Sequence, residues 1–345
     1  MTLHSTLYNV AVVGATGAVG QAMIALLDQR DFPLKSLRLL ASARSIGEQC
    51  DFKRKQLDVE DLAEFDPATI DIALFSAGSE VAKQYAPRFA AAGAVVIDNS
   101  SAFRMDNDVP LVIPEVNSAD LDRRPRGIVA NPNCSTIQMV TALAPIHQAV
   151  GIERIIVSTY QSVSGAGRSA LEELGRQTAT MLAFRPIQAE RFPVQIAFNV
   201  IPQIDDFLDN GYTKEEMKMV METQKILGDD TIQVNPTAVR VPVFYGHSEA
   251  VTIHTRQKIH PSEARSLLER APGVQVVDTC QPGGYPTPVT HASGQDAVFV
   301  GRIRQDLSYP NGLNLWIVSD NLRKGAALNA VKLAERIVVN GLHRT

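Results

Sequence analysis

Cys134 is the residue whose setting in this chain is best suited to chemistry. It lies in the hexapeptide NPNCST (Asn131–Thr136), after an apolar run at Gly127–Ala130 and before a helical pattern over Ile137–Val150. The N-terminus of a helix offers unpaired N–H groups and partial positive charge, which lower the pKa of a thiol placed there. We therefore predict a nucleophilic thiolate at Cys134, against the alternative of a small buried side chain at a helix cap.

Histidine is the residue type that could exchange protons with such a thiol near neutral pH. The chain has seven histidines, and the pattern alone does not choose His247 over His254 or His291. His247 follows a glycine between two extended runs, a position that also suits a solvated turn residue.

Four charged residues could bind an anionic or zwitterionic ligand. Glu215 and Lys218 are three residues apart and share one helix face, which fits a site but also an ordinary surface ion pair. Arg240 lies in an apolar run, where an inward-pointing guanidinium needs an anion. Arg104 follows a strand-like run at the end where parallel sheets hold their ligands, although an arginine there is often only a surface charge.

The N-terminal elements predict a nucleotide site. A buried strand pattern, Tyr8–Val13, runs directly into the glycine turn GATGAVG (Gly14–Gly20) and then into an apolar helical pattern. A turn of this kind holds the pyrophosphate of a dinucleotide on backbone N–H groups, although glycine also serves packing in such turns.

The second strand, Leu37–Leu40, predicts which dinucleotide binds. No acidic residue follows it to bind a ribose 2′-hydroxyl, and the chain instead offers Arg44 between Ser42 and Ser45. A guanidinium flanked by hydroxyls matches a 2′-phosphate, so we predict NADP as the cofactor.

The order of strands and helices predicts an α/β fold of two domains. Strands at Ile70–Phe75 and Ala94–Asp98 flank a helix at Ser79–Ala92, which indicates an N-terminal Rossmann-like, doubly wound parallel sheet. A second α+β domain on a mixed or antiparallel sheet follows. Its expected elements are a helix at Ser169–Phe184, a capping box at Thr213–Glu216 opening a helix to Leu227, and extended runs at Arg154–Gln161, Phe198–Ile204, Thr237–Phe244, Glu249–Lys258, Asp296–Gln305 and Asn314–Ser319.

We place the dinucleotide-binding domain at residues 1–132, completed by the C-terminal helix at about 321–345, and the catalytic and dimerisation domain at 133–320. The helix itself is expected at Lys324–Val339.

Composition limits the class of protein. The 345 residues are 45% hydrophobic and 20% charged with a net charge of -4, which fits a globular protein that binds neither nucleic acid nor a membrane. The other cysteines, Cys50 and Cys280, are far apart and form no CxxC pair, so we expect no metal site and regard both as structural or incidental. Met1–Tyr8 lacks the features of a signal peptide, and a cytoplasmic protein is expected.

The ordered series of motifs resembles the bacterial-type aspartate-semialdehyde dehydrogenase family along nearly the whole chain. The matching strings are GATGAVG, SARS (Ser42–Ser45), NPNCST, YQSVSGAG (Tyr160–Gly167), EEMK (Glu215–Lys218), RVPV (Arg240–Val243), FVGRIR (Phe299–Arg304) and VSDNLRKGAA (Val318–Ala327). This resemblance implies a homodimer that interconverts L-aspartate 4-semialdehyde and L-aspartyl 4-phosphate with NADP and phosphate. It places the reaction in the biosynthesis of lysine (through diaminopimelate), threonine and methionine.

The resemblance also implies roles for individual residues. Cys134 would be the nucleophile, His247 the general acid and base, and Gln161 the residue that orients the substrate. The substrate's ends would be gripped by Glu215 and Arg240, and phosphate would be bound by Arg104, Asn133 and Lys218. The cofactor would contact Gly14, Thr16, Gly17, Ala18, Val19, Arg44, Ser45, Ser164, Gly165 and Asn321.

Two other classes remain open at this point. A related phosphorylating dehydrogenase, such as N-acetyl-glutamyl phosphate reductase or a glyceraldehyde-phosphate type, would keep the cysteine but lack the Glu215 and Arg240 pair. A catalytically idle NADP-binding sensor would be expected to lose Cys134 or His247, and both are present.

Overall fold

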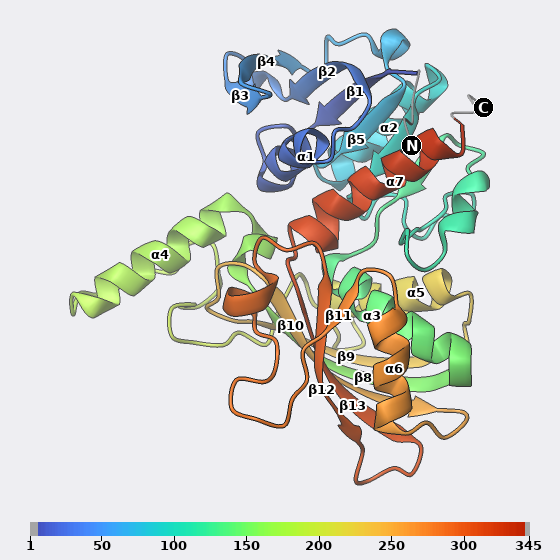
Figure 1. The fold of residues 1–345 in the computed structure, drawn as a ribbon. Coiled ribbons are helices and arrows are strands. Elements are labelled where there is room, and N and C mark those ends of the chain that lie inside the picture. Colours follow the sequence, from blue (N-terminus) through green and yellow to red (C-terminus); the bar gives the residue numbers. More distant parts are fainter. Residues whose placement is uncertain (1–5, 342–345) are drawn as a thin grey trace. The chain divides into compact units, whose positions relative to one another are not determined.

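The computed structural model describes residues 6–341. Contacts divide the chain into two compact units. The first unit runs up to Pro132 and resumes at Ala326, and the second unit is Asn133–Gly325. Each unit carries one sheet, shown with its helices in Figure 1. The predicted fold class, α/β with a Rossmann-like parallel sheet and an α+β part built on a second, mixed sheet, is confirmed.

The first unit is built on a seven-stranded sheet with the order β3-β4-β2-β1-β5-β6-β7. All neighbouring strands are parallel except β3 and β4, which form an antiparallel hairpin. β1 lies between β2 and β5, so the strand order reverses there, and in such sheets ligands bind beyond the carboxyl ends of the strands at the reversal. The strands are β1 (Tyr8–Val13), β2 (Leu34–Ala41), β3 (Gln49–Phe52), β4 (Lys55–Asp61), β5 (Ile72–Phe75), β6 (Val95–Asp98) and β7 (Ile128–Ala130).

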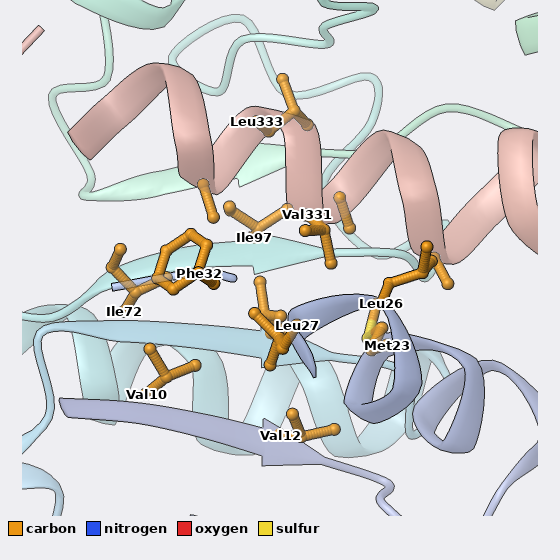
Figure 2. Close-up of a cluster of buried hydrophobic side chains, with 14 of the residues drawn as sticks. Val10, Val12, Met23, Leu26, Leu27, Phe32, Ile72, Ile97, Val331 and Leu333 are labelled. Atoms are coloured by element: carbon orange, nitrogen blue, oxygen red, sulfur yellow. The ribbon is translucent and has the colours of Figure 1, made fainter. Parts of the chain in front are cut away.

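The core of the first unit lies between this sheet and two helices that are distant in sequence, α1 (Ala18–Gln29) and α7 (Leu328–Val339). Figure 2 shows Val331 of α7 beside Ile97 of β6, with Leu27 of α1 on the same cluster. Arg30, which caps α1, adds a two-pronged ion pair with Glu335 of α7 at 2.7 and 2.9 Å. The remaining helix of the unit is α2 (Ser79–Ala91).

The second unit holds a six-stranded mixed sheet with the order β11-β12-β13-β10-β8-β9. Helices α3, α5 and α6 pack against one face of it (Figure 1). The strands are β8 (Ile152–Gln161), β9 (Gln233–Arg240), β10 (His247–Thr255), β11 (Val274–Val276), β12 (Val298–Gln305) and β13 (Gly312–Ser319), and the helices are α3 (Cys134–Val150), α4 (Arg168–Leu182), α5 (Lys214–Leu227) and α6 (Pro261–Arg270).

Several boundaries in the second unit differ from the prediction. β9 ends at Arg240 and includes Pro236, which an edge strand tolerates because its outer N–H groups need no partner. The expected extended run Phe198–Ile204 contributes only an isolated bridge between Ile201 and Arg240. His247, expected in the connection between two extended runs, is the first residue of β10.

Other elements carried no clear signal in the sequence. The β3–β4 hairpin turns at Lys53 and Arg54, whose φ angles of 46° and 64° are left-handed without the usual glycine or asparagine. The predicted helix from Lys324 begins instead with a π-helical turn at Arg323–Ala327, and α7 follows it. The sequence pattern also did not predict α6 or β11.

Candidate active site

Cys134 is the first residue of α3, as the sequence predicted. Asn133 has the extended backbone of an N-cap, and its Oδ1 accepts the N–H groups of Ser135 at 3.0 Å and Thr136 at 3.4 Å. Gly325 lies so close that a Cβ on it would come within 2.8 Å of the Cβ of Cys134. The thiol is partly exposed and sits at the positive end of a 17-residue helix dipole, a setting that favours the thiolate.

The backbone and side chain of Asn133 are both held by α5. Its N–H donates to Glu222 Oε2 at 2.7 Å, and its Nδ2 donates to Glu215 Oε1 at 2.9 Å. No motif in the sequence indicated Glu222. A signal for it exists, since Glu215 and Glu222 are seven residues apart and occupy positions that face inward on an amphipathic helix.

Glu215 is the point where several predicted substrate residues meet. It lies in the first turn of α5, which is fixed by the capping box between Thr213 and Glu216, and it is buried. Besides Asn133, it accepts Gln161 Nε2 at 3.3 Å and Lys218 Nζ at 3.2 Å. Gln161 reaches it from the end of β8. These contacts define an anionic group able to accept further donors, such as an ammonium.

Lys218 stays charged in this arrangement. Burial works to lower its pKa, but the carboxylates of Glu215 and Asp205 outweigh that effect and raise it. Lys218 Nζ is 2.8 Å from Asp205 Oδ2, and this pairing in turn lowers the pKa of Asp205 against the opposing effect of burial.

Arg240, at the end of β9, is buried and donates from Nη1 to the carbonyl of Ser162 at 2.7 Å. The charges of Glu215 and Cys134 both act on it, so the anion expected for an inward arginine is supplied from nearby. Because Gly165 has no side chain, Arg240 and His247 can both lie close to it: a Cβ at this position would be 3.1 Å from Arg240 Nη1 and 3.3 Å from His247 Nε2.

His247 is fully buried at the start of β10. The backbone N–H of Ser162 donates to Nδ1 at 3.1 Å, so the neutral ring carries its proton on Nε2. Within residues 6–341, Nε2 has no hydrogen-bond partner. Burial, and secondly the positive charge of Arg240, set the pKa of His247 well below its ordinary value, so the ring is neutral at neutral pH.

Ser162 connects His247 to residues predicted to touch the cofactor. Its Oγ lies 3.1 Å from His247 Nδ1 and 3.0 Å from Asn321 Oδ1. Asn321 Oδ1 also accepts the hydroxyl of Ser164 at 3.1 Å and the N–H of Gly246 at 3.0 Å. Ser164 and Asn321 are therefore buried members of the network that holds the histidine ring, a role that their motifs alone did not indicate.

The glycine turn of the first unit borders a cleft of about 580 Å³. Gly14 has a φ of +84°, and a Cβ on it would come within 2.8 Å of the carbonyl oxygen of Ser76, so glycine is required there. Four residues predicted to touch the cofactor line this cleft, namely Gly14, Thr16, Gly17 and Ser45, and the hydroxyls of Thr16 and Ser45 are 3.3 Å apart. Ala18 and Val19 open α1, where backbone N–H groups point outward from the helix end.

Two residues near this cleft bear on the choice of dinucleotide. Arg44 is exposed in the 3-10 turn Ala43–Ser45 that follows β2. Asp61, at the end of β4, also lines the cleft, because β4 lies beside β2. An acid is therefore present, although none follows β2 in sequence. Its Oδ1 accepts the N–H of Ala63 at 3.0 Å.

Arg104, predicted to bind phosphate, is buried within the first unit and committed largely to backbone. Its Nε donates to the carbonyl of Asn131 at 2.9 Å and its Nη2 to that of Asn99 at 2.7 Å. Asp98 lies nearby; burial raises the pKa of its carboxyl, while Ser100 and Arg104 oppose that rise.

The structure thus brings together, within the second unit, the predicted residues Cys134, Asn133, Gln161, Glu215, Lys218, Arg240 and His247. Across residues 6–341 it forms no group of three or more His, Cys, Asp or Glu side chains able to hold a metal ion. In the same range, no helix combines the length and apolar character needed to cross a membrane.

Comparison with protein families gives two matches. The NAD binding domain of semialdehyde dehydrogenases matches residues 9–124, and the semialdehyde dehydrogenase dimerisation domain matches residues 143–324. Among curated proteins, aspartate-semialdehyde dehydrogenase from Legionella pneumophila is 60% identical over 328 residues, covering 95% of this chain and 94% of that protein. The enzyme of the same name from Bacillus subtilis is 52% identical, covering 95% and 97%.

Solved structures agree. Aspartate semialdehyde dehydrogenase II from Vibrio cholerae, complexed with ASA, is 55% identical with a TM-score of 0.95, covering 97% of this chain and 99% of that one. A probable aspartate-semialdehyde dehydrogenase from Pseudomonas aeruginosa is 39% identical with a TM-score of 0.92, covering 96% and 99%.

Proposed function

This chain belongs to the aspartate-semialdehyde dehydrogenase family, and from that premise we propose which of its residues carry out the family's reaction. The reaction interconverts L-aspartate 4-semialdehyde and L-aspartyl 4-phosphate. The observation that carries the assignment is the convergence of Cys134, His247, Glu215 and Arg240 within one compact unit. A nucleophile, a proton-transferring ring and a matched pair of charges for an amino acid are what this chemistry requires.

Cys134 is the nucleophile. In the biosynthetic direction its thiolate attacks the acyl phosphate, the C–S bond forms, and phosphate leaves from the tetrahedral intermediate. Reduction of the resulting thioester gives a thiohemiacetal, which collapses to the aldehyde and returns the thiolate. A thiolate suits both ends of this sequence, because it is a strong nucleophile and a good leaving group.

His247 acts on the oxygen of the reacting carbon. The neutral ring donates from Nε2–H, which stabilises an oxyanion by a hydrogen bond. To act as a base, the ring must first hold its one proton on Nδ1, and Ser162 Oγ, 3.1 Å away, is the acceptor for that proton. The lone pair of Nε2 is then free to take a proton from the reacting group, and the ring carries two protons. Ser162 therefore allows His247 to serve both as donor and as base.

The substrate's two ends are recognised by opposite charges. Glu215 accepts the α-ammonium and Arg240 meets the α-carboxylate with its planar guanidinium, while Gln161 orients the reacting carbonyl. Lys218 and Asn133, together with Arg104, bind phosphate. The raised pKa of Lys218 supports this role, because phosphate binding needs a permanent cation.

The cofactor is NADP. The cleft fits a dinucleotide, since Gly14 admits the close approach of a pyrophosphate that a Cβ would block. NADP, when bound, accepts or supplies the hydride that interconverts the thiohemiacetal and the thioester. Arg44 is exposed and able to reach a 2′-phosphate, whereas Asp61, the acid that would favour NAD, is bonded to its own loop through Ala63.

The second unit forms a homodimer through the face of its sheet that α3, α5 and α6 leave uncovered. Residues that alternate with the helix-facing ones lie there, and Tyr160 of β8 and Trp316 of β13 pack together on it with ring centroids 5.6 Å apart. A large half-buried aromatic pair on an open sheet face is typical of a surface that a second copy covers. Multi-angle light scattering should give a dimer, and Ala250→Arg at the centre of this face should give a monomer. We place the enzyme in the cytoplasm, because a chain whose three cysteines are all free suits a reducing compartment.

The test is an assay of NADP reduction with aspartate semialdehyde and phosphate. Turnover should require both, and N-acetylglutamate semialdehyde should be used at least 100-fold less well, because acetylation removes the ammonium that Glu215 accepts. Cys134→Ser should lose nearly all turnover, while Cys134→Ala should still bind NADP. A wild-type preference for the acetylated substrate would instead indicate the reductase of that substrate.

A further inference from the structure

Glu249 is a fully buried carboxyl that none of the assigned roles uses. It is the third residue of β10, and its neighbours across the sheet are Thr159 of β8 and Ile317 of β13. In the part of the chain that the structure describes, neither of its oxygens makes a hydrogen bond of standard geometry. An acid in such a place is costly, so its presence needs an explanation.

The position of Glu249 relates it to both catalytic side chains. His247 is two residues earlier on β10, and because side chains alternate along a strand the two residues point to the same, helix-covered face. On the opposing helix α3, Gln138 comes one turn after Cys134 and therefore lies on the same side of that helix.

Gln138 connects the helix to the sheet. Its Oε1 accepts the hydroxyl of Ser319 at 2.7 Å, and Ser319 is the residue directly opposite His247 on β13. Gln138 Nε2 has no partner of standard geometry among residues 6–341, but the amide is close enough to Glu249 to counteract the effect of burial on that carboxyl. Gln138, Ser319 and Glu249 thus form a buried polar layer between α3, which carries Cys134, and the strands β10 and β13, of which β10 carries His247.

Burial of this layer favours the uncharged form of Glu249. Burial raises the pKa of its carboxyl well above the ordinary value, and the amide of Gln138 offsets this only in part. A neutral acid both donates and accepts, as does an amide, so Glu249 and Gln138 are chemically matched partners.

We propose that Glu249 is a positioning residue: its buried carboxyl, on the face of β10 that meets Gln138 of α3, fixes α3 against β10 and so sets the distance between Cys134 and His247. Apolar contacts alone would allow helix and sheet to slide, whereas a directional polar contact in a buried layer specifies one arrangement. Only the kinetic part of the test described next depends on the proposed function.

The experiment compares Glu249→Gln, which keeps a neutral polar group of the same shape, with Glu249→Leu, which keeps only the volume. For Glu249→Leu we expect kcat to fall at least tenfold, KM for aspartate semialdehyde to change less than threefold, and Tm to stay equal or rise. Glu249→Gln should keep kcat within threefold. Val251→Ala, on the same face of β10, is the control: it should lower Tm and leave kcat unchanged.

A second readout needs no turnover. In a Cys280→Ser background, which removes the exposed thiol, the rate of Cys134 alkylation by iodoacetamide reports the thiolate population directly. Glu249→Leu should slow it at least threefold and Glu249→Gln should not. If wild type fails to use aspartate semialdehyde, the proposed function falls while this arm still decides the role of Glu249.

Two outcomes would overturn the proposal. Full kcat and full alkylation rate in Glu249→Leu would show that the layer positions nothing. Equal losses in Glu249→Leu and Glu249→Gln would show that the acid acts through a charge or a transferable proton, which a neutral positioning residue does not have.

Discussion

Removing the hydroxyl of Ser162 should separate the two functions of His247. The backbone N–H of Ser162 remains in Ser162→Ala, so the neutral ring keeps its orientation and its proton on Nε2. The protonated ring, however, loses the acceptor that lies 3.1 Å from Nδ1 and is left with that N–H facing another donor. The variant should therefore bind substrate normally and fail in the step where His247 carries two protons.

The magnitude follows from the type of bond that is lost. A hydrogen bond to a charged group contributes about 1.5–3 kcal/mol, which corresponds to a decrease in kcat of about 10- to 150-fold. Because the imidazolium is disfavoured further, the pKa of His247 falls below its already lowered value, and the acidic limb of the kcat profile should move to lower pH.

The assay is steady-state kinetics at saturating cofactor from pH 5 to 9. Ser162→Thr, which retains a hydroxyl, should recover much of the activity, and Ser158→Ala, on the uncovered face of β8, controls for the loss of a serine hydroxyl. If Ser162→Ala kept kcat within twofold of wild type with the same pH profile, the assignment of Ser162 as the Nδ1 acceptor would be wrong.

Three further predictions concern other residues. Burial lowers the pKa of His247 from 6.5, so the free energy of unfolding should decrease as pH falls below 6.5, whereas the raised pKa of Glu249 should make it decrease as pH rises above 4.5. In urea unfolding, His247→Gln should remove the decrease at falling pH and Glu249→Gln the decrease at rising pH. Arg44→Ala should weaken NADP by about 1.5–3 kcal/mol and leave NAD nearly unchanged in binding titrations, and equal losses would exclude a contact with the 2′-phosphate. Lys218→Ala should raise KM for phosphate most and Arg240→Lys should impair use of the semialdehyde; an Arg240 defect confined to phosphate saturation would reverse these two roles.

The local parts of this structure were predictable because their signals are local. The strand Tyr8–Val13 was predicted to the residue, since a buried parallel strand is a continuous apolar run bounded here by glycine. The position of Cys134 and the cap at Asn133 followed from the NPNCST turn, and the capping box at Thr213 was equally readable.

The strand bounds that were predicted wrongly depend on neighbouring strands that are distant in the sequence. β9 and β10 follow one another in sequence, but β8 lies between them, and the bounds of β9 are set by its pairing with β8. His247 looked like a turn residue because the residue before it is glycine, yet pairing with Ser319 makes it part of a strand.

The candidate site divides in the same way. Motifs predicted the residues whose side chains could do chemistry, whereas they did not predict the residues that position those side chains. Glu222 and Glu249 look like ordinary members of an amphipathic helix and a strand. Only the packed structure shows that both are buried, that Glu222 accepts the N–H of Asn133, and that Glu249 shares a face of β10 with His247.

The return of α7 to the first unit has a consequence for synthesis of the protein. The residues of α7 that pack in one cluster with Met23, Leu26 and Leu27 of α1 are translated some three hundred positions later. While the ribosome makes the 193 residues from Asn133 to Gly325, which hold the whole of the second sheet, the first unit exposes an apolar surface with no covering helix. The second unit therefore has all of its own strands before the first can close, and the nascent chain presents a binding surface for chaperones until Val338 has emerged.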